Sequence, residues 1–346
     1  MRIDGHPIGT NSATFIVAEL SANHRQDFDH AVRLVEAAKH AGADAVKLQT
    51  YRPDTLTIRC DRPEFRIDGG TPWDGRTLWD LYAEAAMPWH WQPKLQQVAR
   101  RLGLVFFSTA FDPSAVDFLE QMNVPAYKIA SFELVDLPLL RRVARTGKPI
   151  ILSTGLATLA EIQEAVATIR AAGDSPLALL KCTSAYPAPA ESMNLRTIPH
   201  LAKTFGLPVG LSDHTLEPAV PVAAVALGAC IIEKHLTLSR ADAAPDSPFS
   251  LQPDEFKQMV QAIRATDAAL GSVAYGPGGQ EACGRCFRRS LFAVQEIHAG
   301  EPFTTQNVRC IRPGHGLPPR HLEEILGQTA QQDIAQGTPL APNHLT

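Results

Sequence analysis

The sequence has no excess of basic residues and no long apolar run. Lys and Arg number 32 against 36 Asp and Glu, which gives a formal net charge of -4. A chain with this balance lacks the attraction needed for a nucleic-acid backbone or an anionic membrane surface. No stretch approaches the roughly 20 apolar residues of a spanning helix, and none near the start is typical of a signal peptide. We therefore expect a cytoplasmic protein without a nucleic-acid or membrane partner, in which any anionic ligand is bound locally.

Cysteine is scarce, and its six occurrences do not form a disulfide framework. Cys182 and Cys230 lie in apolar runs and are expected to be reduced core residues. Cys283 and Cys286 form a CGRC motif, which in other proteins marks redox chemistry or half of a zinc site. Here the motif follows a Gly/Pro-rich stretch without a second CxxC, so a surface linker is favoured over metal or redox function.

Short apolar runs alternate with helical patterns along most of the chain. With 346 residues, 45% of them hydrophobic, the chain is long enough to bury a large core. Patterns such as TLAEIQEAVATIRAAG follow most of the runs, and this alternation favours parallel βαβ units. Eight such units predict a closed (β/α)8 TIM barrel. The expected strand ends lie near Ala18, Leu48, Phe107, Ile129, Leu152, Lys181, Leu211 and Ile232.

The pattern changes near residue 272. We expect a barrel over residues 1–271, a linker over 272–286, and a small β-rich domain over 287–346. The segment from Tyr51 to Trp91 is too long for an ordinary βα connection, so it is expected to hold an active-site loop and an extra helix.

Polar, chemistry-capable residues recur where the apolar runs end. A parallel barrel delivers the last residues of every strand to one face, so these side chains are predicted to surround a single cavity. That arrangement indicates an enzyme. The residues are Glu19, Lys47, Gln49, Thr109, Lys128, Ser131, Ser153, Tyr186, His214 and His235.

His214 and His235 end the last two predicted strands. Two imidazoles at adjacent strand ends suit a divalent metal that polarises a carbonyl or positions water. Either histidine taken singly is more often a hydrogen-bonded barrel residue. Considered together, they favour the metal site.

Lys47 and Lys128 each lie in an otherwise apolar strand, where an unpaired ammonium would be costly. A structural ion pair and an anionic ligand are both open for each lysine. The neighbouring hydroxyls, although many of them cap helices, favour a phosphate and carboxylate site. They belong to Thr109, Ser131, Ser153 and Ser212.

Two glutamates are candidates for acid-base work. Glu19 ends the first strand, where it is placed to bind a substrate hydroxyl or transfer a proton, and Glu133 follows the Lys128 and Ser131 cluster. Pairing with a barrel lysine is the structural alternative for each. Glu233, beside His235, is expected to orient a neighbouring ligand.

The spaced motifs resemble the N-acetylneuraminate synthase family over nearly the whole chain. They are VAELSANH, GADAVKLQTY, FFSTAFD, PAYKIASFE, ILSTG, KCTSAYP, VGLSDHT, GACIIEKH and FRRSL. The resemblance implies a barrel followed by a C-terminal antifreeze-like (SAF) domain. Within the family, SANH, KCTSAYPAP and SRADAAPDSPFSL are most similar to pseudaminic acid synthases.

That resemblance implies a transferase of the C–C bond-forming type. It would condense phosphoenolpyruvate with 2,4-diacetamido-2,4,6-trideoxy-L-altrose and release phosphate and a nonulosonic acid. Thr109, Lys128, Ser131, Ser153 and Ser212 would then hold the phosphate. Lys47 and Ser184 would meet the carboxylate, while Glu19, Gln49 and Tyr186 would face the sugar. Glu133 is the candidate for proton transfer.

The resemblance also implies a cofactor and a partner. His214 and His235 would hold Mn²⁺, with Mg²⁺ or Co²⁺ as alternatives. The C-terminal domain would reach the active site of a second chain in a domain-swapped homodimer and contribute an arginine. Arg312 is preferred over Arg309, and a solvated surface arginine is the alternative.

Three other functions stay open. A sialic or legionaminic acid synthase would use a different amino sugar. A Schiff-base aldolase would use a lysine such as Lys128 as nucleophile. A sugar- or ice-binding module on an inert barrel is disfavoured, because an inert barrel has no reason to desolvate so many ionisable groups.

Overall fold

Parallel strands form a closed barrel at the centre of the first part of the chain. The computed structural model describes residues 1–9 and 11–346, and within them eight strands pair in the order β3 to β10, with β10 closing onto β3. The predicted (β/α)8 barrel is thereby confirmed. The strands are β3 (Phe15–Glu19), β4 (Ala45–Thr50), β5 (Val105–Ala110), β6 (Tyr127–Ile129), β7 (Ile150–Ser153), β8 (Leu177–Cys182), β9 (Val209–Asp213) and β10 (Ile231–His235).

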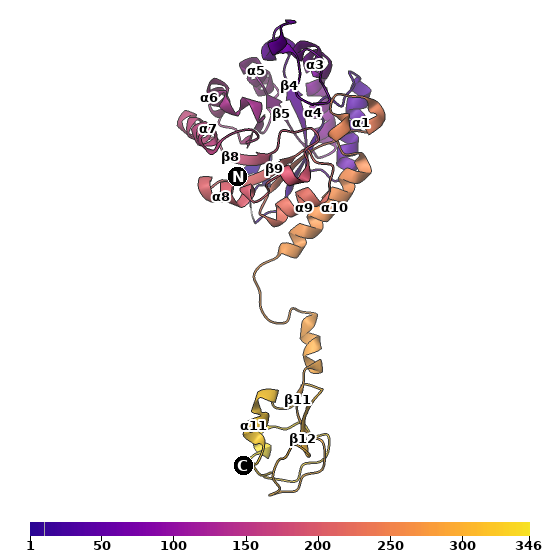
Figure 1. Ribbon diagram of the computed structural model, residues 1–346, viewed down its shortest axis with the longest axis vertical. Coiled ribbons are helices and arrows are strands. Elements are labelled where there is room, and N and C mark those ends of the chain that lie inside the picture. The colour runs from indigo at the N-terminus through magenta and orange to yellow at the C-terminus, as the bar shows by residue number, and fades with distance from the viewer. Residues whose placement is uncertain (10) are drawn as a thin grey trace. The chain divides into compact units, whose positions relative to one another are not determined.

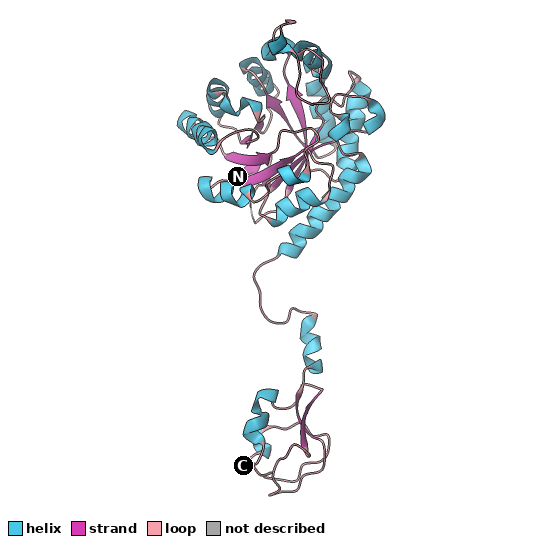
Figure 2. Ribbon diagram, in the orientation of Figure 1, coloured by secondary structure: helices cyan, strands magenta, loops and turns pink. Residues whose placement is uncertain are grey.

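Helices surround the strands on the outside of the barrel (Figures 1 and 2). In α1, the buried residues Ala31, Leu34, Val35 and Ala38 lie at the spacing of one helical face, which packs on the barrel wall. A capping box formed by Thr158 and Glu161 begins α7. These helices are α1 (Phe28–His40), α4 (Gln92–Arg101), α5 (Pro113–Gln121), α6 (Leu137–Ala144), α7 (Leu159–Ala172), α8 (Thr197–Phe205), α9 (Ala219–Ala226) and α10 (Pro253–Leu270).

The barrel interior is apolar at its N-terminal end. Alternate strand residues point inward, so Phe15 and Val17 of β3 pack against Phe107, Ile151 and other inward-facing side chains. Ile3 and Ile8 belong to the same cluster. Ile3 lies in, and Ile8 directly follows, a short hairpin of β1 (Arg2–Ile3) and β2 (His6–Pro7), which packs against this end of the barrel. The opposite end is therefore the open mouth.

The long connection between β4 and α4 contains short helices, as expected for the segment from Tyr51 to Trp91. It holds α2 (Pro53–Leu56), η1 (Pro63–Phe65), α3 (Leu78–Ala85) and η2 (Trp89–Trp91). The other short 3₁₀ turns of this unit follow later strands. They are η3 (Phe132–Val135), η4 (Ala190–Ser192), η5 (Arg240–Asp242) and η6 (Ser247–Phe249).

The chain divides into two compact units, Met1–Gly271 and Ser272–Thr346. In the second unit, β11 (Ser290–Ala293) and β12 (Val308–Ile311) pair antiparallel. Leu291, Phe303 and Ile334 are among the side chains of a separate small core. The short helices here are η7 (Glu281–Phe287), η8 (Pro319–His321), α11 (Leu322–Ile325) and η9 (Pro342–His344).

The stretch expected to be a linker is structured at its end. The helix η7 begins at Glu281, inside residues 272–286, and the amide of Gly314 donates a hydrogen bond to the carbonyl of its Cys286 at 2.9 Å. This contact attaches η7 to the small domain. Among the described residues, no helix combines the length and the apolar character needed to cross a membrane.

Candidate active site

Buried polar side chains from neighbouring strands meet at the mouth of the barrel. Most lie two residues beyond an apolar inward position, as Glu19 follows Val17, so strand alternation points them to the interior. His214 and His235 in turn lie two residues beyond the inward Ser212 and Glu233. The expectation that these side chains share one cavity rests on the same alternation of side chains along each strand. The members that the structure buries are Glu19, Lys47, Thr109, Lys128, Ser153, Ser212, Glu233, His214 and His235.

Lys47 is neutralised by carboxylates. Its ammonium pairs directly with Glu19, lies 3.6 Å from Glu233 and donates to the hydroxyl of Thr109 at 2.9 Å. Burial acts to lower the pKa of Lys47, but the charges of Glu19 and Glu233 outweigh it and raise the pKa. Burial raises the pKa of Glu19 to about 7 despite the lysine. The structure therefore shows Glu19 paired with a barrel lysine, Lys47, which was the structural alternative for this residue.

The charge of Lys128 is neutralised less completely than that of Lys47. Its ammonium donates to the hydroxyl of Ser153 at 2.7 Å and to the carbonyl of Ile129 at 3.0 Å. In the described part of the chain its nearest carboxylate is that of Glu233, at 3.9 Å, outside hydrogen-bond distance. Burial lowers the pKa of Lys128, and Glu233 offsets only part of that effect. A buried, incompletely paired cation is suited to an anionic ligand.

Two serine hydroxyls lie against a glycine beside Lys128. The amide of Gly155 donates to the hydroxyl of Ser131 at 3.1 Å. A Cβ added at Gly155 would lie 2.4 Å from the Ser184 hydroxyl and 2.7 Å from that of Ser131. A residue with a side chain would therefore displace both hydroxyls. Serine hydroxyls at the ends of neighbouring strands, together with the Lys128 ammonium, are suited to bind a phosphate group.

The imidazoles of His214 and His235 lie side by side, with ring centroids 5.3 Å apart. The Nδ1 atom of His214 lies 3.0 Å from the carbonyl of Thr183, which leaves Nε2 for another partner. The Nδ1 atom of His235 is buried and has no hydrogen-bond partner within residues 1–9 and 11–346. Burial lowers the pKa of His235 well below its usual value, which keeps the ring neutral, as a metal ligand must be.

These residues fit a divalent ion held by two imidazoles. Across the described residues no group of three or more His, Cys, Asp or Glu side chains is arranged to hold a metal. Protein ligands would thus occupy only part of a coordination shell. Sites of this kind leave positions open for water or substrate oxygens, as in catalytic rather than structural metal centres.

Aromatic rings cover the histidines. Tyr186 lies 4.5 Å from His214 and Phe249 lies 5.0 Å from His235, measured between ring centroids. Trp73, from the long connection after β4, packs against Tyr186 in a tilted arrangement, with ring centroids 5.5 Å apart. Its indole N–H donates to the carbonyl of Pro245 at 3.0 Å. The long connection therefore reaches the site, as expected. The rings of Trp73, Tyr186 and Phe249 together form an aromatic wall beside the two histidines.

Gln49 and Asp246 meet at Ser21 on the other side of the histidines. Gln49 donates to the hydroxyl of Ser21 at 3.1 Å, and that hydroxyl donates to Asp246. Asp246 also lies 3.9 Å from Nδ1 of His235. This polar group is suited to hydroxyl or amide groups of a ligand.

Glu133 lies on η3, beyond the end of β6. One of its carboxylate oxygens is buried without a hydrogen-bond partner among the described residues. Burial raises the pKa of Glu133 from 4.5 to about 7, although Lys128 acts to lower it. A carboxyl that titrates near neutrality is suited to proton transfer.

Sequence reasoning expected Glu233 only to orient a ligand beside His235, and it did not predict Asp246. Glu233 lies between Lys47 and Lys128 and accepts from Ser212 at 3.3 Å, so it balances both lysines. Its position two residues before His235 was the available signal. Asp246 lies in a loop without a strand pattern, so no periodicity pointed to it.

Arg312 belongs to the second unit and is exposed there. It starts a turn that Ser290 holds, because the Ser290 hydroxyl donates to the carbonyl of Pro313 at 2.7 Å and accepts from the amide of Gly316 at 2.8 Å. The turn thus presents an exposed guanidinium on a fixed backbone.

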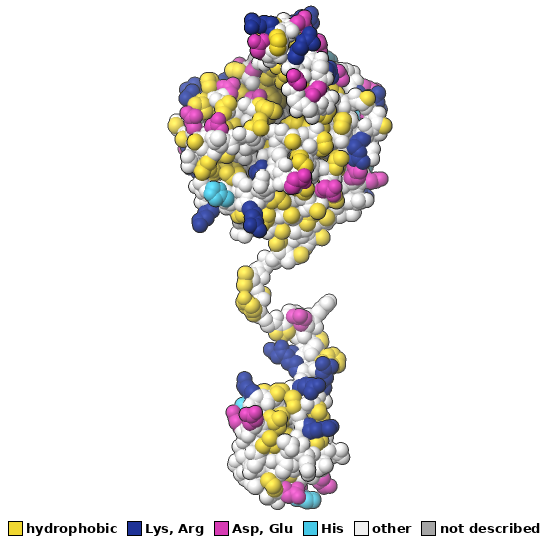
Figure 3. Space-filling view, in the orientation of Figure 1, with side chains coloured by type: hydrophobic (Ala, Val, Ile, Leu, Met, Phe, Trp, Pro, Cys, Tyr) yellow, Lys and Arg dark blue, Asp and Glu magenta, His cyan; other side chains and the backbone are white. Residues whose placement is uncertain are grey.

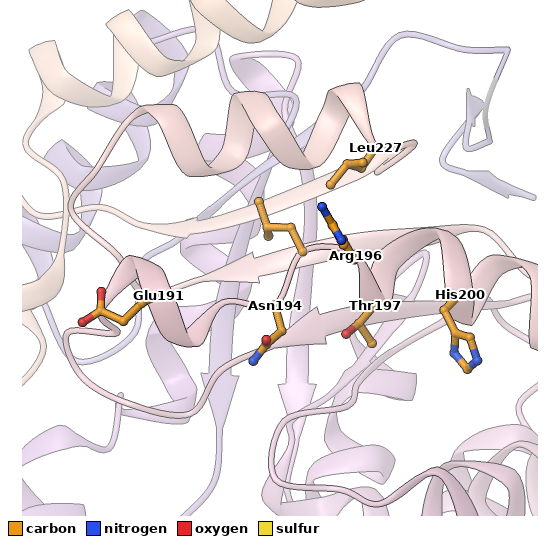
Figure 4. Close-up of a pocket in the computed structure, with 7 residues that line it drawn as sticks. Glu191, Asn194, Arg196, Thr197, His200 and Leu227 are labelled. Atoms are coloured by element: carbon orange, nitrogen blue, oxygen red, sulfur yellow. The ribbon is translucent and has the colours of Figure 1, made fainter.

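A separate surface hollow of about 690 Å³ lies beside α8, outside the barrel mouth (Figure 4). Its walls come from the segment before α8, from α8 itself and from the end of α9. The lining residues are Glu191, Asn194, Leu195, Arg196, Thr197, His200 and Leu227. It does not share residues with the histidine and lysine cluster described above.

Family models match both units. The NeuB family model covers residues 34–275 and the SAF domain model covers residues 288–346. The chain belongs to the NeuB family. The family resemblance read from the motifs is therefore confirmed, and so is the C-terminal SAF domain.

Curated relatives of this NeuB family member match nearly end to end. A pseudaminic acid synthase from Helicobacter pylori is 45% identical over 95% of this chain and 97% of its own length. An N,N'-diacetyllegionaminic acid synthase from Legionella pneumophila is 36% identical over 98% of this chain and 96% of its own. The crystal structure of a sialic acid synthetase from Leptospira borgpetersenii in complex with citrate matches with TM-score 0.73 and 30% identity, over 82% of this chain and 94% of that one.

Proposed function

We propose that this protein is a pseudaminic acid synthase. It condenses phosphoenolpyruvate with 2,4-diacetamido-2,4,6-trideoxy-L-altrose to give a nonulosonic acid and phosphate. One observation carries the proposal: three kinds of group lie together in one barrel mouth. They are the two imidazoles of His214 and His235, the Lys128 ammonium, whose charge is only partly neutralised, and the serine hydroxyls around Gly155. Similarity supports the choice of sugar, since the chain is more similar to a pseudaminic acid synthase than to a legionaminic acid synthase.

Phosphoenolpyruvate is assigned to the lysine side of the site. Lys128, with Ser153 and the serine hydroxyls around Gly155, binds the phosphate, because a buried ammonium and several hydroxyl donors converge there. The carboxylate of phosphoenolpyruvate is assigned to Lys47 and Ser184. When the substrate carboxylate binds there, the Lys47 ammonium pairs with it as well as with Glu19, its present partner.

The sugar is assigned to the histidine side, under the aromatic wall. Tyr186 and Phe249 pack against its apolar face, while Gln49 and Asp246 meet its hydroxyl and acetamido groups. His214 and His235 would hold a divalent ion, Mn²⁺ in this proposal, which would supply Lewis acidity for the sugar's carbonyl.

The reaction then needs fixed positive charge and one proton donor. C3 of phosphoenolpyruvate attacks the aldehyde carbon, water adds at C2, and phosphate leaves by cleavage of its C–O bond. Lys128 stabilises the charge on the departing phosphate from a position that is already set before the reaction. Glu133, with its pKa near 7, is protonated or ionised as each step requires.

A domain-swapped homodimer in the cytoplasm completes the proposal. Arg312 of one chain enters the active site of the other and adds a guanidinium to the anionic substrate. Its exposure on a fixed turn supports this role, because an exposed guanidinium is free to bind an anion.

The decisive experiment measures inorganic phosphate released from phosphoenolpyruvate. We expect release only when the altrose substrate and a divalent ion are both present, with a product mass equal to that of a pseudaminic acid. A panel of amino sugars under the same conditions separates the alternatives. Faster release with the sialic or legionaminic precursor would overturn the assigned sugar, and turnover that chelation leaves unchanged would overturn the metal.

A Schiff-base aldolase is separated by borohydride trapping. Pyruvate and borohydride would label Lys128 in such an enzyme, whereas the proposed synthase stays unlabelled because its lysines act as cations. Sugar binding without phosphate release under any metal would instead support a non-catalytic module.

A further inference from the structure

The cysteines of the CGRC motif lie in one turn of a 3₁₀ helix. Both Cys283 and Cys286 are exposed, and both belong to η7 (Glu281–Phe287). In a 3₁₀ helix, side chains three residues apart eclipse each other, and their Cα atoms are about 6 Å apart along the axis. Disulfides join Cα atoms about 4.4–6.8 Å apart. The spacing therefore lies within the disulfide range, and closing the bond requires the Cys286 thiol to leave the carbonyl of Cys283, to which it donates at 3.0 Å, and the turn of η7 to shift.

Arginines surround this dithiol. Arg285 lies between the two cysteines, and Arg288 and Arg289 follow them, all exposed. Glu281, whose carboxylate accepts from the amide of Gly278 at 3.3 Å, is the acidic residue of the helix. Figure 3 shows basic side chains gathered where η7 leads into the small domain. A cationic surface of this kind attracts anionic reagents such as glutathione disulfide.

The same helix supports the turn that carries Arg312. The carbonyl of Cys286 accepts from the amide of Gly314 at 2.9 Å. A Cβ added at Gly314 would lie 2.8 Å from the carbonyl of Arg285, so the turn backbone packs directly on the helix. A change in the Cys286 backbone is therefore passed to the residues that follow Arg312.

We propose that Cys283 and Cys286 form a reversible dithiol-disulfide site that controls the position of the Arg312 turn. One cysteine thiolate attacks a low-molecular-weight disulfide and releases one thiol. The second cysteine then attacks the mixed disulfide and releases the other thiol. Two cysteine thiols are oxidised, one disulfide is reduced to two thiols, and the two cysteine protons pass to the released thiols.

The consequence for catalysis rests on the proposed function. Closing the disulfide tightens the turn of η7 and draws the Cys286 carbonyl away from Gly314. Arg312 then leaves its working position, and a displacement of about 1 Å is enough to slow an enzyme by a factor of ten or more. The oxidised protein is the less active form.

The test uses the full-length protein equilibrated with glutathione and glutathione disulfide at graded ratios. Maleimide labelling and peptide mass mapping report the thiols, and phosphate release is measured on the same samples. We expect Cys283 and Cys286 to lose reactivity together, in an intrachain disulfide that lowers the mass by about 2 Da. Activity is expected to fall about tenfold and to return with dithiothreitol.

Matched variants locate the effect. The double variant Cys283→Ser/Cys286→Ser is expected to keep the activity of the reduced protein at every ratio. Cys60→Ser and Cys310→Ser, which change partly buried cysteines elsewhere, are expected to retain the full redox response.

Distinct results would overturn the site and its effect. Stable glutathione adducts, interchain crosslinks or a disulfide to Cys310 would each exclude the Cys283–Cys286 pair. A disulfide at this pair that leaves activity unchanged, in a protein that Arg312→Ala inactivates, would exclude the coupling. If no synthase activity is found in any state, the proposed function fails, while the thiol mapping still decides the dithiol site.

Discussion

Lys234 and Asp213 form a buried ion pair with 2.6 Å between Nζ and Oδ2, and each is adjacent in sequence to a histidine of the site. They are register partners on β10 and β9, and they point away from the barrel interior because their neighbours point inward. Lys234 also donates to the carbonyl of Thr215, whose amide donates to Asp213 at 2.9 Å. The ion pair therefore links β9 and β10, and it holds the strand ends that carry His214 and His235 in fixed positions.

Breaking this pair is expected to destabilise the protein strongly. Asp213→Ala leaves a buried, unpaired ammonium, so the free energy of unfolding should fall by about 3–5 kcal/mol. The double variant Lys234→Met/Asp213→Leu removes both charges and should recover most of that loss. Urea unfolding measures both. Arg142→Ala, which breaks an exposed pair with Asp117, serves as the control and should cost at most about 1 kcal/mol.

Replacing either histidine is expected to remove divalent-ion binding. His214→Ala or His235→Ala deletes one of two protein ligands, so Mn²⁺ affinity should fall at least about a hundredfold, together with phosphate release. Isothermal titration with Mn²⁺ reports affinity independently of turnover. His200→Ala, on the exposed surface of α8, should bind Mn²⁺ as the unchanged protein does. Equal Mn²⁺ affinity in all variants would contradict the assigned site.

Gly155→Ala is expected to weaken phosphoenolpyruvate binding while preserving the fold. The new methyl group displaces the hydroxyls of Ser131 and Ser184, which can rotate away at little cost to stability. The KM for phosphoenolpyruvate should rise about tenfold, equal to about 1.4 kcal/mol, with a melting temperature close to the original. Gly69→Ala, where a methyl group meets no atom within 4 Å, is the control. An unchanged KM would argue against a phosphate site at these hydroxyls.

Glu133→Gln is expected to alter both the pH profile and the stability. The folded protein keeps the Glu133 carboxyl protonated up to about pH 7, whereas the unfolded chain ionises near 4.5. Relative to Glu133→Gln, the free energy of unfolding should therefore fall as pH rises from about 4.5 to 7, by about 3 kcal/mol in total, and then stay level.

Urea unfolding at graded pH checks this difference. Near pH 7 the activity profile of the unchanged enzyme should include an ionisation of Glu133 that Glu133→Gln removes, while the contribution of Glu19, whose pKa is also raised to about 7, remains. Glu164→Gln, on the exposed face of α7, should leave the stability and the activity profile unaltered. A Glu133→Gln variant with the original pH profile would exclude Glu133 from proton transfer.

Mixing two inactive chains is expected to restore activity if the proposed dimer is swapped. Co-expressed Arg312→Ala and His214→Ala chains would form mixed dimers in which one site combines an intact barrel with an intact arginine. Random pairing then gives about a quarter of the original activity, although each variant by itself is inactive. Activity no higher than that of the single variants would mean that Arg312 does not act across the dimer.

The barrel could be predicted from the sequence because its signals are local. Each strand is a short apolar run, and several helices, such as α1, α5 and α7, begin at a capping side chain. Parallel pairing needs only the alternation of these elements. The inward direction of Lys47, Lys128, His214 and His235 follows from the same alternation, since side chains on a strand point to opposite faces in turn.

Only the tertiary structure decided which of the charged groups inside the barrel mouth neutralise each other. Sequence spacing does not reveal that Lys47 is paired with Glu19 while Lys128 lacks a bonded carboxylate, because these residues come from different strands. Asp246 reaches His235 from a loop without periodicity, and Gly155 meets two hydroxyls from other strand ends.

What the sequence by itself determined, then, was the architecture and the set of side chains that face the cavity, because both depend on contacts between near neighbours. The close packing of residues distant in the chain decided which charges are neutralised, which atoms lack a partner, and how the Cys283–Cys286 helix supports the Arg312 turn. These properties depend on distances of a few ångströms between separate elements, and such distances exist only once the chain has folded.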